Sequence, residues 1–280
     1  MRNFTFKGLL LTAVFMLLGC LSIQAANDDL ITKQITIKLD KAGTLPDRIA
    51  SSEMYKITNL KIIGEINGTD WNMIREMAGR DNRGYGTEGK LSVLDLSEAK
   101  IVKGGDSYYP GDNCYTSNDE IGEKAFYDCG RLTSLTLPVG ITSIGYDAFA
   151  YCSGLTSLTL PAGITSIGEF AFSYCSGLTS IYVYAEKVPR IGRYAFEGCA
   201  SRKCTLYVPK GTYDNYRRSE FGYFVNIVEF DATGIDKTTT STDVEEVSRY
   251  SVNGQRLAVP VKGLNIVKYS DGTVRKVVVK

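Results

Sequence analysis

The sequence contains no histidine, and this absence excludes several kinds of chemistry. A Ser-His-Asp triad or a Cys-His pair needs an imidazole, which is also the side chain best suited to proton transfer near neutral pH. Histidine is also a common ligand of zinc and iron, and this sequence cannot supply it. Catalysis by carboxylate, lysine or tyrosine stays open, but no paired carboxylates stand out. We therefore expect no catalytic residues, no metal site and no cofactor.

The sequence also lacks an excess of charge of either sign. Its 32 Lys and Arg residues nearly balance 31 Asp and Glu residues, for a formal net charge of +1. Such a chain has no field that would concentrate nucleic acid, so we expect no nucleic-acid partner. Long apolar runs are absent as well. The longest, residues 8–18, falls short of the ~20 residues of a membrane-spanning helix, so we expect no transmembrane span.

The start of the chain has the pattern of an export signal. Arg2 and Lys7 precede the apolar run, and the small residues Ala25 and Ala26 follow it. A basic start, a short apolar region and small residues at the end are typical of a signal peptide. We therefore predict a signal peptide over residues 1–26, and localisation at the cell surface, at the outer membrane or outside the cell.

Cys20 offers a second way to process this segment. The order Leu17-Leu18-Gly19-Cys20 also resembles a bacterial lipoprotein box. We prefer cleavage after Ala25 or Ala26, because Leu21 continues the apolar stretch beyond the cysteine. If Cys20 is the lipid-bearing residue instead, acyl chains would anchor the protein to a membrane surface.

The middle of the chain repeats itself. The pattern I-G-x-x-A-F-x-x-C-x-x-L-T-S-L-T-L-P-x-G-I-T-S begins at residues 121, 144 and 167, and a looser copy begins at residue 191. Its cysteines, Cys129, Cys152, Cys175 and Cys199, are spaced 23, 23 and 24 residues apart. A period of this length is typical of a solenoid of stacked coils.

Each repeat predicts one strand and one helical turn. Leu132, Leu135 and Leu137 follow the spacing L-x-x-L-x-L, whose alternating end is typical of a half-buried strand. Pro138 ends the strand, because it has no backbone donor, and Gly140 supplies the turn. The segment A-F-x-x-C is too short for a long helix, so we expect one helical turn that buries the Phe and the Cys.

Stacked in parallel, these units predict columns of like side chains. The fold class is therefore a β-rich leucine-rich-repeat solenoid with short helical turns, an N-terminal α/β cap and a small C-terminal β domain. The expected columns are Leu135, Leu158 and Ile181; Leu137, Leu160 and Val183; and, on the far side, Phe126, Phe149, Phe172 and Phe196.

The flanking segments predict caps, a linker and a tail. We expect an N-terminal cap over residues 27–110, the repeats with a C-terminal cap over 111–230, a linker over 231–243 and a small β tail over 244–280. The N-terminal cap should hold a helix over 70–77, with Thr69 or Asp70 as its N-cap. At the other end, 204–209 should be the last strand, and 213–224 should cover the open end.

The repeat of residues 121–209 resembles the BspA-type leucine-rich repeats of bacterial surface proteins. The segment 67–80 is similar to the leader that accompanies such repeats in Bacteroidales. The tail, with Asn253-Gly254-Gln255-Arg256-Leu257 and the terminal Val277-Val278-Val279-Lys280, is similar to the sorting-type domains of that phylum. The resemblance implies a cell-surface or secreted protein that adheres to host matrix proteins or to other bacteria, and no known catalytic site.

The outward side of the strands is the candidate ligand surface, because neighbouring repeats make it one continuous face. Tyrosine gives large contact area at low entropic cost. The tyrosines could instead pack under the C-terminal cap or shield the sheet edge. By alternation, the outward positions are Ser134, Thr136, Ser157, Thr159, Ser180, Tyr182, Tyr184 and Tyr207.

The cysteine column does not have the spacing of a metal site. We expect these side chains to run parallel inside the core as reduced thiols, with Cys199 and Cys204 as the one pair worth testing for a disulfide. Asp112, Asp119 and Glu120 fit no calcium-loop spacing, and a solvated turn accounts for them.

Together these patterns predict an exported, non-enzymatic module that binds a protein ligand, either host matrix or another bacterial surface protein. The alternative is a glycan-binding or scaffold component of the cell envelope. The sequence does not identify the ligand, because the repeat frame fixes the core and says little about what the exposed positions recognise.

Overall fold

The computed structural model describes residues 29–109, 114–232, 246–251, 256–257, 263–269 and 274–279. The chain divides after Phe230 into two compact units, here called unit 1 and unit 2. Among our expectations, the signal segment 1–26, Cys20, Asp112 and nearly all of the linker lie outside the described residues.

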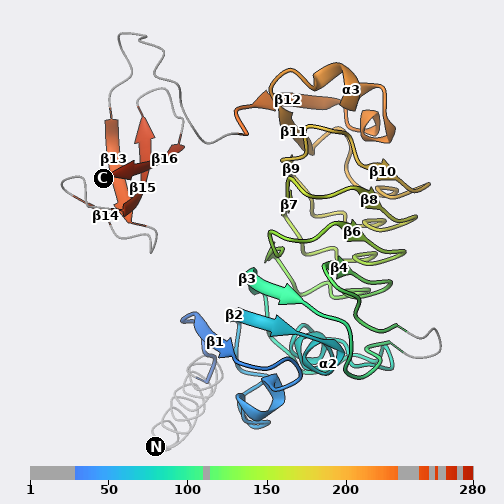
Figure 1. Cartoon of the computed structure of the whole chain (residues 1–280), viewed down its shortest axis with the longest axis vertical. Coiled ribbons are helices and arrows are strands. Elements are labelled where there is room, and N and C mark those ends of the chain that lie inside the picture. The colour runs from blue at the N-terminus through green and yellow to red at the C-terminus, as the bar shows by residue number, and fades with distance from the viewer. Residues whose placement is uncertain are drawn as a thin grey trace, which may run out of the picture. The chain divides into compact units, whose positions relative to one another are not determined.

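Unit 1 is built on an eight-stranded parallel sheet (Figure 1). Inward residues alternate with outward ones along each strand, as the repeat pattern predicts. In sheet order, the strands are β1 (Ile35–Leu39), β2 (Asn59–Ile66), β3 (Val93–Ile101), β5 (Ser134–Thr136), β7 (Ser157–Leu160), β9 (Ser180–Val183), β11 (Thr205–Pro209) and β12 (Asn226–Phe230).

The register of this sheet stacks the leucine positions of successive coils. Leu94 pairs with Leu135, Leu158 pairs with Ile181, and Ile181 pairs with Leu206. All five are buried. The structure therefore confirms the β-rich leucine-rich-repeat solenoid.

A second parallel sheet runs along the array and was not predicted. Its four strands hold two residues each: β4 (Glu120–Ile121), β6 (Ser143–Ile144), β8 (Ser166–Ile167) and β10 (Arg190–Ile191). The isoleucines of β4, β6 and β8 are buried. The motif I-T-S-I-G thus forms the very short strands β6 and β8, and the residues before Gly122 and Gly192 form β4 and β10 in the same place.

The helical turn that we predicted over A-F-x-x-C is wrong. Residues 123–128 form successive turns, and Lys124 and Asp128 have φ values of 53° and 57°. A helix needs negative φ at every position. The amide of Phe126 instead leaves its own coil and donates to the carbonyl of Ala148, in the next coil, at 2.7 Å.

This arrangement repeats in three successive coils, and we call it the turn ladder. Alternate amides close turns within the coil, and the others donate to the following coil. The second kind comprises nine bonds of 2.6–3.1 Å: Lys124 to Tyr146, Phe126 to Ala148, Asp128 to Ala150, Asp147 to Glu169, Phe149 to Ala171, Tyr151 to Ser173, Phe170 to Arg193, Phe172 to Ala195 and Tyr174 to Glu197.

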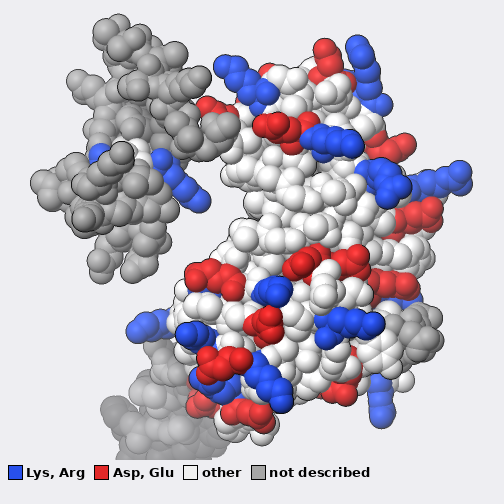
Figure 2. Space-filling view, viewed as in Figure 1, with Lys and Arg blue, Asp and Glu red and all other residues white. Residues whose placement is uncertain are grey.

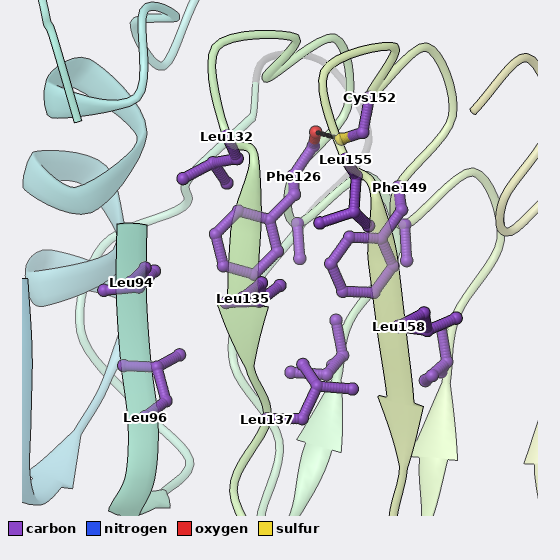
Figure 3. Close-up of a cluster of buried hydrophobic side chains, with 14 of the residues drawn as sticks. Leu94, Leu96, Phe126, Leu132, Leu135, Leu137, Phe149, Cys152, Leu155 and Leu158 are labelled. Carbon is purple, nitrogen blue, oxygen red and sulfur yellow. Dashed lines mark hydrogen bonds between the residues drawn. The ribbon is translucent and has the colours of Figure 1, made fainter. Parts of the chain in front are cut away.

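The phenylalanine column lies between the turn ladder and the main sheet. The rings of Phe126, Phe149, Phe172 and Phe196 stack with centroids 5.2, 5.0 and 5.4 Å apart. Figure 3 shows the rings of Phe126 and Phe149 side by side, close to Leu135 and Leu158. The prediction that these four residues line up is confirmed.

The N-terminal cap holds two helices, η1 (Leu45–Asp47) and α2 (Gly68–Met77). The N-cap of α2 is Asn67, not Thr69 or Asp70 as we predicted. Asp70 lies one turn inside the helix, where its buried carboxylate accepts bonds from the amides of Asn67 and Leu45. It therefore completes a capping box and also fixes the preceding loop to the helix.

Side chains of the cap donate to carbonyls of the first coil, among them that of Ala125, the position that accepts a ladder bond in the later coils. The indole Nε1 of Trp71 donates to the carbonyl of Ala125 at 2.9 Å. The buried Arg75 donates from Nη1 to the carbonyls of Lys124 and Ala125, and Arg80 donates from Nε to that of Asp128. An unsatisfied buried carbonyl would cost about 1–3 kcal/mol, so these donors stabilise the start of the array.

The C-terminal cap consists of α3 (Tyr213–Arg217) and η2 (Glu220–Tyr223). Phe221 and Phe224 pack on Phe196 with centroids 5.4 and 5.1 Å away, so they continue the phenylalanine column. Residues 213–224, which we expected to cover the open end, therefore cover its phenylalanine column. The expectation that 204–209 is the last strand is wrong, because β12 pairs beyond it.

Unit 2 contains an antiparallel sheet in the order β14-β13-β15-β16. The turn that we predicted at Asn253-Gly254 lies outside the described residues. The strands are β13 (Glu246–Ser251), β14 (Arg256–Leu257), β15 (Gly263–Tyr269) and β16 (Val274–Val279).

Replacing Phe149 tests the column directly. Phe149→Ala removes a buried ring from between two stacked neighbours, and we expect it to lower the free energy of unfolding by about 3–5 kcal/mol. Denaturant unfolding followed by circular dichroism measures this loss. The control is Val139→Ala in the turn after β5, where the side chain is 75% exposed and the change should stay within about 0.5 kcal/mol. Similar small losses for both variants would contradict the stacked core.

Candidate binding surface

The outward side chains of the main sheet form rows that cross the coils. One row contains Val93, Ser134, Ser157, Ser180, Thr205 and Asn226. The next row contains Lys61, Asp95, Thr136, Thr159, Tyr182, Tyr207 and Val228. We call these two rows, with Tyr184, the strand face. All eight residues that we predicted for the ligand surface lie on it.

The second row changes character along its length. At the N-terminal end, Lys61 forms ion pairs with Asp95 and Glu98 at 3.3 and 2.6 Å. The pKa of Lys61 is raised, chiefly by its hydrogen bond with Glu98. The middle coils carry threonine there, and the last coils carry tyrosine. Figure 2 shows charged side chains gathered over the N-terminal cap and few over the middle of the array on the side in view.

Some hydroxyl groups of the middle coils form hydrogen bonds between neighbouring coils. Ser180 and Ser157 lie 3.0 Å apart, Oγ to Oγ. The threonine before each strand donates its hydroxyl to the carbonyl one coil back, as Thr156 does to Thr133 and Thr179 does to Thr156. The threonines that donate these bonds lie outside the two rows. Ser134 and Thr136, which belong to the rows, are exposed.

The tyrosines of the last coils form an aromatic cluster. The rings of Tyr182 and Tyr207 stack with centroids 4.4 Å apart and an interplanar angle of 6°. Phe230, from β12, packs edge-on against Tyr182 and Tyr184 at 6.0 and 5.1 Å. Val228 lies beside Tyr207 and is 45% exposed. The cluster is therefore packed on one side and open on the other.

Phe230 and Val228 are the members of the aromatic cluster that our sequence reasoning missed. The signal that could have located them was the short apolar run Ile227-Val228, which we did not read as a strand. The pKa of Tyr182 is raised by burial and then by the neighbouring Tyr207. Its phenol therefore stays protonated at neutral pH and can donate a hydrogen bond.

The cysteine column is part of the core. Cys129, Cys152, Cys175, Cys199 and Cys204 are buried and form no disulfide. Each sulfur of Cys152, Cys175 and Cys199 donates to a phenylalanine carbonyl of the preceding coil at 3.0–3.2 Å, and Figure 3 shows the first of these bonds. Burial raises the pKa of Cys199 to about 12 and that of Cys204 to about 11. These thiols therefore stay protonated at neutral pH.

A hollow lies at the N-terminal cap. It measures about 770 Å³ and is lined by η1, α2 and the loop before the repeats, including Asp47, Glu53, Glu76 and Asp106. Burial, and then Asp81, raises the pKa of Glu76. Across the described residues, no three potential ligands lie close enough to hold a metal ion.

Comparison with protein families assigns the repeats. Residues 114–227 match the family model of the BspA type leucine rich repeat region, in six copies. These residues are BspA-type leucine-rich repeats. Among solved structures, the chain is similar to a leucine-rich repeat protein from Bacteroides ovatus, with 22% sequence identity and a TM-score of 0.34. That match covers 71% of this chain and 42% of the other chain. No curated protein matches the sequence at a significant level.

BspA-type repeats are typical of non-enzymatic scaffolds and indicate a surface or protein-binding role. Within the parts of the chain that the structure describes, no helix has the length and apolar character needed to cross a membrane.

Proposed function

We propose that this protein is exported and that its strand face binds another protein, either a host matrix protein or a surface protein of other bacteria. The observation that carries the proposal is the aromatic cluster at the end of the strand face, where Tyr182, Tyr184 and Tyr207 are all partly exposed. Buried tyrosine contacts are prominent among the residues that dominate protein interfaces.

The cluster suits a binding surface because its rings are already held in place. Tyr182 and Tyr207 stack on each other, and Phe230 supports Tyr182 and Tyr184 from the sheet edge. A partner therefore meets side chains that lose little further freedom on binding, and this lowers the entropic cost of association. The hydroxyls of Ser134 and Thr136 extend the same face with hydrogen-bonding groups.

Replacing Tyr182, Tyr184 and Tyr207 together with Ala should weaken partner binding about tenfold or more, because the contact area and the hydroxyl groups are lost. The measurement is surface plasmon resonance against immobilised purified matrix proteins and bacterial surface proteins. The single variant Tyr184→Ala, at a residue 37% exposed, tests the surface with less disturbance of the sheet.

The matched control is Tyr85→Ala, in the loop after α2, where the tyrosine is 69% exposed and lies outside the strand face. It should bind as the wild type does. Unchanged affinity in the triple variant, with an unchanged melting temperature, would contradict the proposed surface. Binding to a glycan array and to none of the proteins would favour the glycan-binding alternative.

Export is the second part of the proposal, and it rests on the pattern of residues 1–26. We propose that the tail 244–280 is a sorting-type domain that directs the exported protein, which fits its resemblance to such domains in Bacteroidales.

Mass spectrometry of the mature N-terminus tests the export route. Cleavage after Ala25 or Ala26 should leave an unmodified N-terminus near Asn27. An acylated Cys20 would show a lipoprotein instead, and a retained Met1 in the cell-envelope fraction would contradict a cleaved signal.

A further inference from the structure

The turn ladder has a direction, and this leaves its last coil incomplete. In each of the preceding coils, three amides donate to carbonyls of the following coil. The corresponding amides of the last coil belong to Tyr194, Phe196 and Gly198. Within the described residues, none of these three donates a hydrogen bond. The array therefore ends in a row of backbone donors.

The two ends of the ladder are capped differently. At the N-terminal end, Trp71 and Arg75 donate to the carbonyl of Ala125, which is equivalent to the ladder acceptors Ala148 and Ala171, and Arg80 donates to that of Asp128. At the C-terminal end, β12 extends the main sheet, and Phe221 extends the phenylalanine column. No described residue supplies carbonyls to the last amides.

The second sheet stops at the same coil. The carbonyls of Ile121, Ile144 and Ile167 each accept a bond from the glycine that begins the next coil's turn. Ile191 occupies this position in the last coil, and β10 pairs with β8 alone. The last coil thus offers the carbonyl of Ile191 as an acceptor beside its row of amide donors. A polypeptide backbone carries both donors and acceptors and can therefore pair with both.

A pocket of about 310 Å³ lies at this open end. This volume falls at the lower limit of known ligand pockets and suits one side chain with its backbone. Ile191 and Phe196 line its floor, and η2 contributes Glu220 and Tyr223. The hydroxyl of Tyr223 donates to the carbonyl of Cys199 at 2.9 Å, which fixes the position of this ring.

The outer part of the pocket is aromatic and acidic. Tyr194 and Tyr223 are 59% and 44% exposed, and Glu197 and Glu220 lie beside them. Neither carboxylate forms an ion pair with a described residue. Tyrosine rings attract cations, and unpaired carboxylates do so more strongly.

We propose that this pocket binds a peptide segment of a partner protein that carries Lys or Arg. The peptide's carbonyls accept bonds from the amides of Tyr194 and Phe196, as a further coil of the array would. Its basic side chain lies between the two tyrosine rings and reaches Glu197 and Glu220. A saccharide offers hydroxyl groups but no positive charge to match the two carboxylates. This second site is separate from the strand face.

The test uses three blocked tripeptides, acetylated and amidated, with the sequences Ala-Arg-Ala, Ala-norleucine-Ala and Ala-Glu-Ala. Each is titrated into the full-length ¹⁵N-labelled protein and followed by amide chemical shifts. We expect the arginine peptide to shift the amides of Tyr194, Phe196 and Gly198 in a saturable way. Loss of the charge should weaken binding by about fivefold or more in the norleucine peptide. The glutamate peptide should not saturate.

The variant Glu197→Gln with Glu220→Gln should reduce binding of the arginine peptide to the level of the norleucine peptide. The matched control, Glu169→Gln with Glu186→Gln, removes two exposed carboxylates outside the pocket and should leave binding unchanged.

Several results would overturn the proposal. These are equal binding of the three peptides, shifts confined to other amides, or an unchanged arginine titration in the pocket variant. Saturable shifts of the same amides by maltose, without any by the arginine peptide, would assign the pocket to saccharides instead. The chemical shifts report on amides of the last coil only. A negative result here can therefore be told apart from a negative result with the variant of Tyr182, Tyr184 and Tyr207.

Discussion

The structure depends on hydrogen bonding between successive coils. Each coil has backbone donors and acceptors on both rims, and only part of them pair within the coil. The main sheet, the second sheet and the turn ladder satisfy these groups with those of the neighbouring coil. The phenylalanine and leucine columns then fill the space between the three ladders. A single coil therefore has no stable structure of its own, and the array depends on its caps.

This constraint explains why the two caps differ. The first coil exposes carbonyls of the turn ladder, and long side chains of a helix can reach such acceptors with indole and guanidinium donors. The last coil exposes amides, which water, side-chain oxygens or another backbone can satisfy. The C-terminal cap extends the sheet and the core but leaves this rim to a ligand. The strand face differs from this rim, because its side chains can bind a partner without any unpaired backbone group.

Much of the core could be predicted from the sequence because its spacing is nearly invariant. A period of 23 or 24 residues places Phe126, Phe149 and Phe172 in one column whatever the details of the coil. The spacing of A-F-x-x-C, however, fits one helical turn as well as a chain of tight turns. Only the positive φ angles of Lys124 and Asp128 separate the two, and although aspartate is enriched at positive φ, lysine gives no such signal.

The candidate surface was predictable in strands whose inward and outward residues alternate clearly. It was missed in β12, a strand that the sequence analysis did not predict. Tyr182 and Tyr207 follow from their place in a strand, but Phe230 belongs to a strand without leucines. Asn67 could have been recognised as the N-cap from the acidic residue three positions later, because this pairing is the capping-box pattern. The pocket at the last coil arises from missing neighbours, and no motif within the coil marks it.

Native-state hydrogen exchange, followed by amide resonances, tests the account most directly. If bonds between coils hold the array together, the amides of Phe149 and Phe172 should exchange only through global unfolding, with protection free energies close to the stability of unit 1. The amides of Tyr194 and Gly198, which end the turn ladder, should exchange far faster. Equal and rapid exchange at all four positions would contradict the claim that this ladder joins the coils.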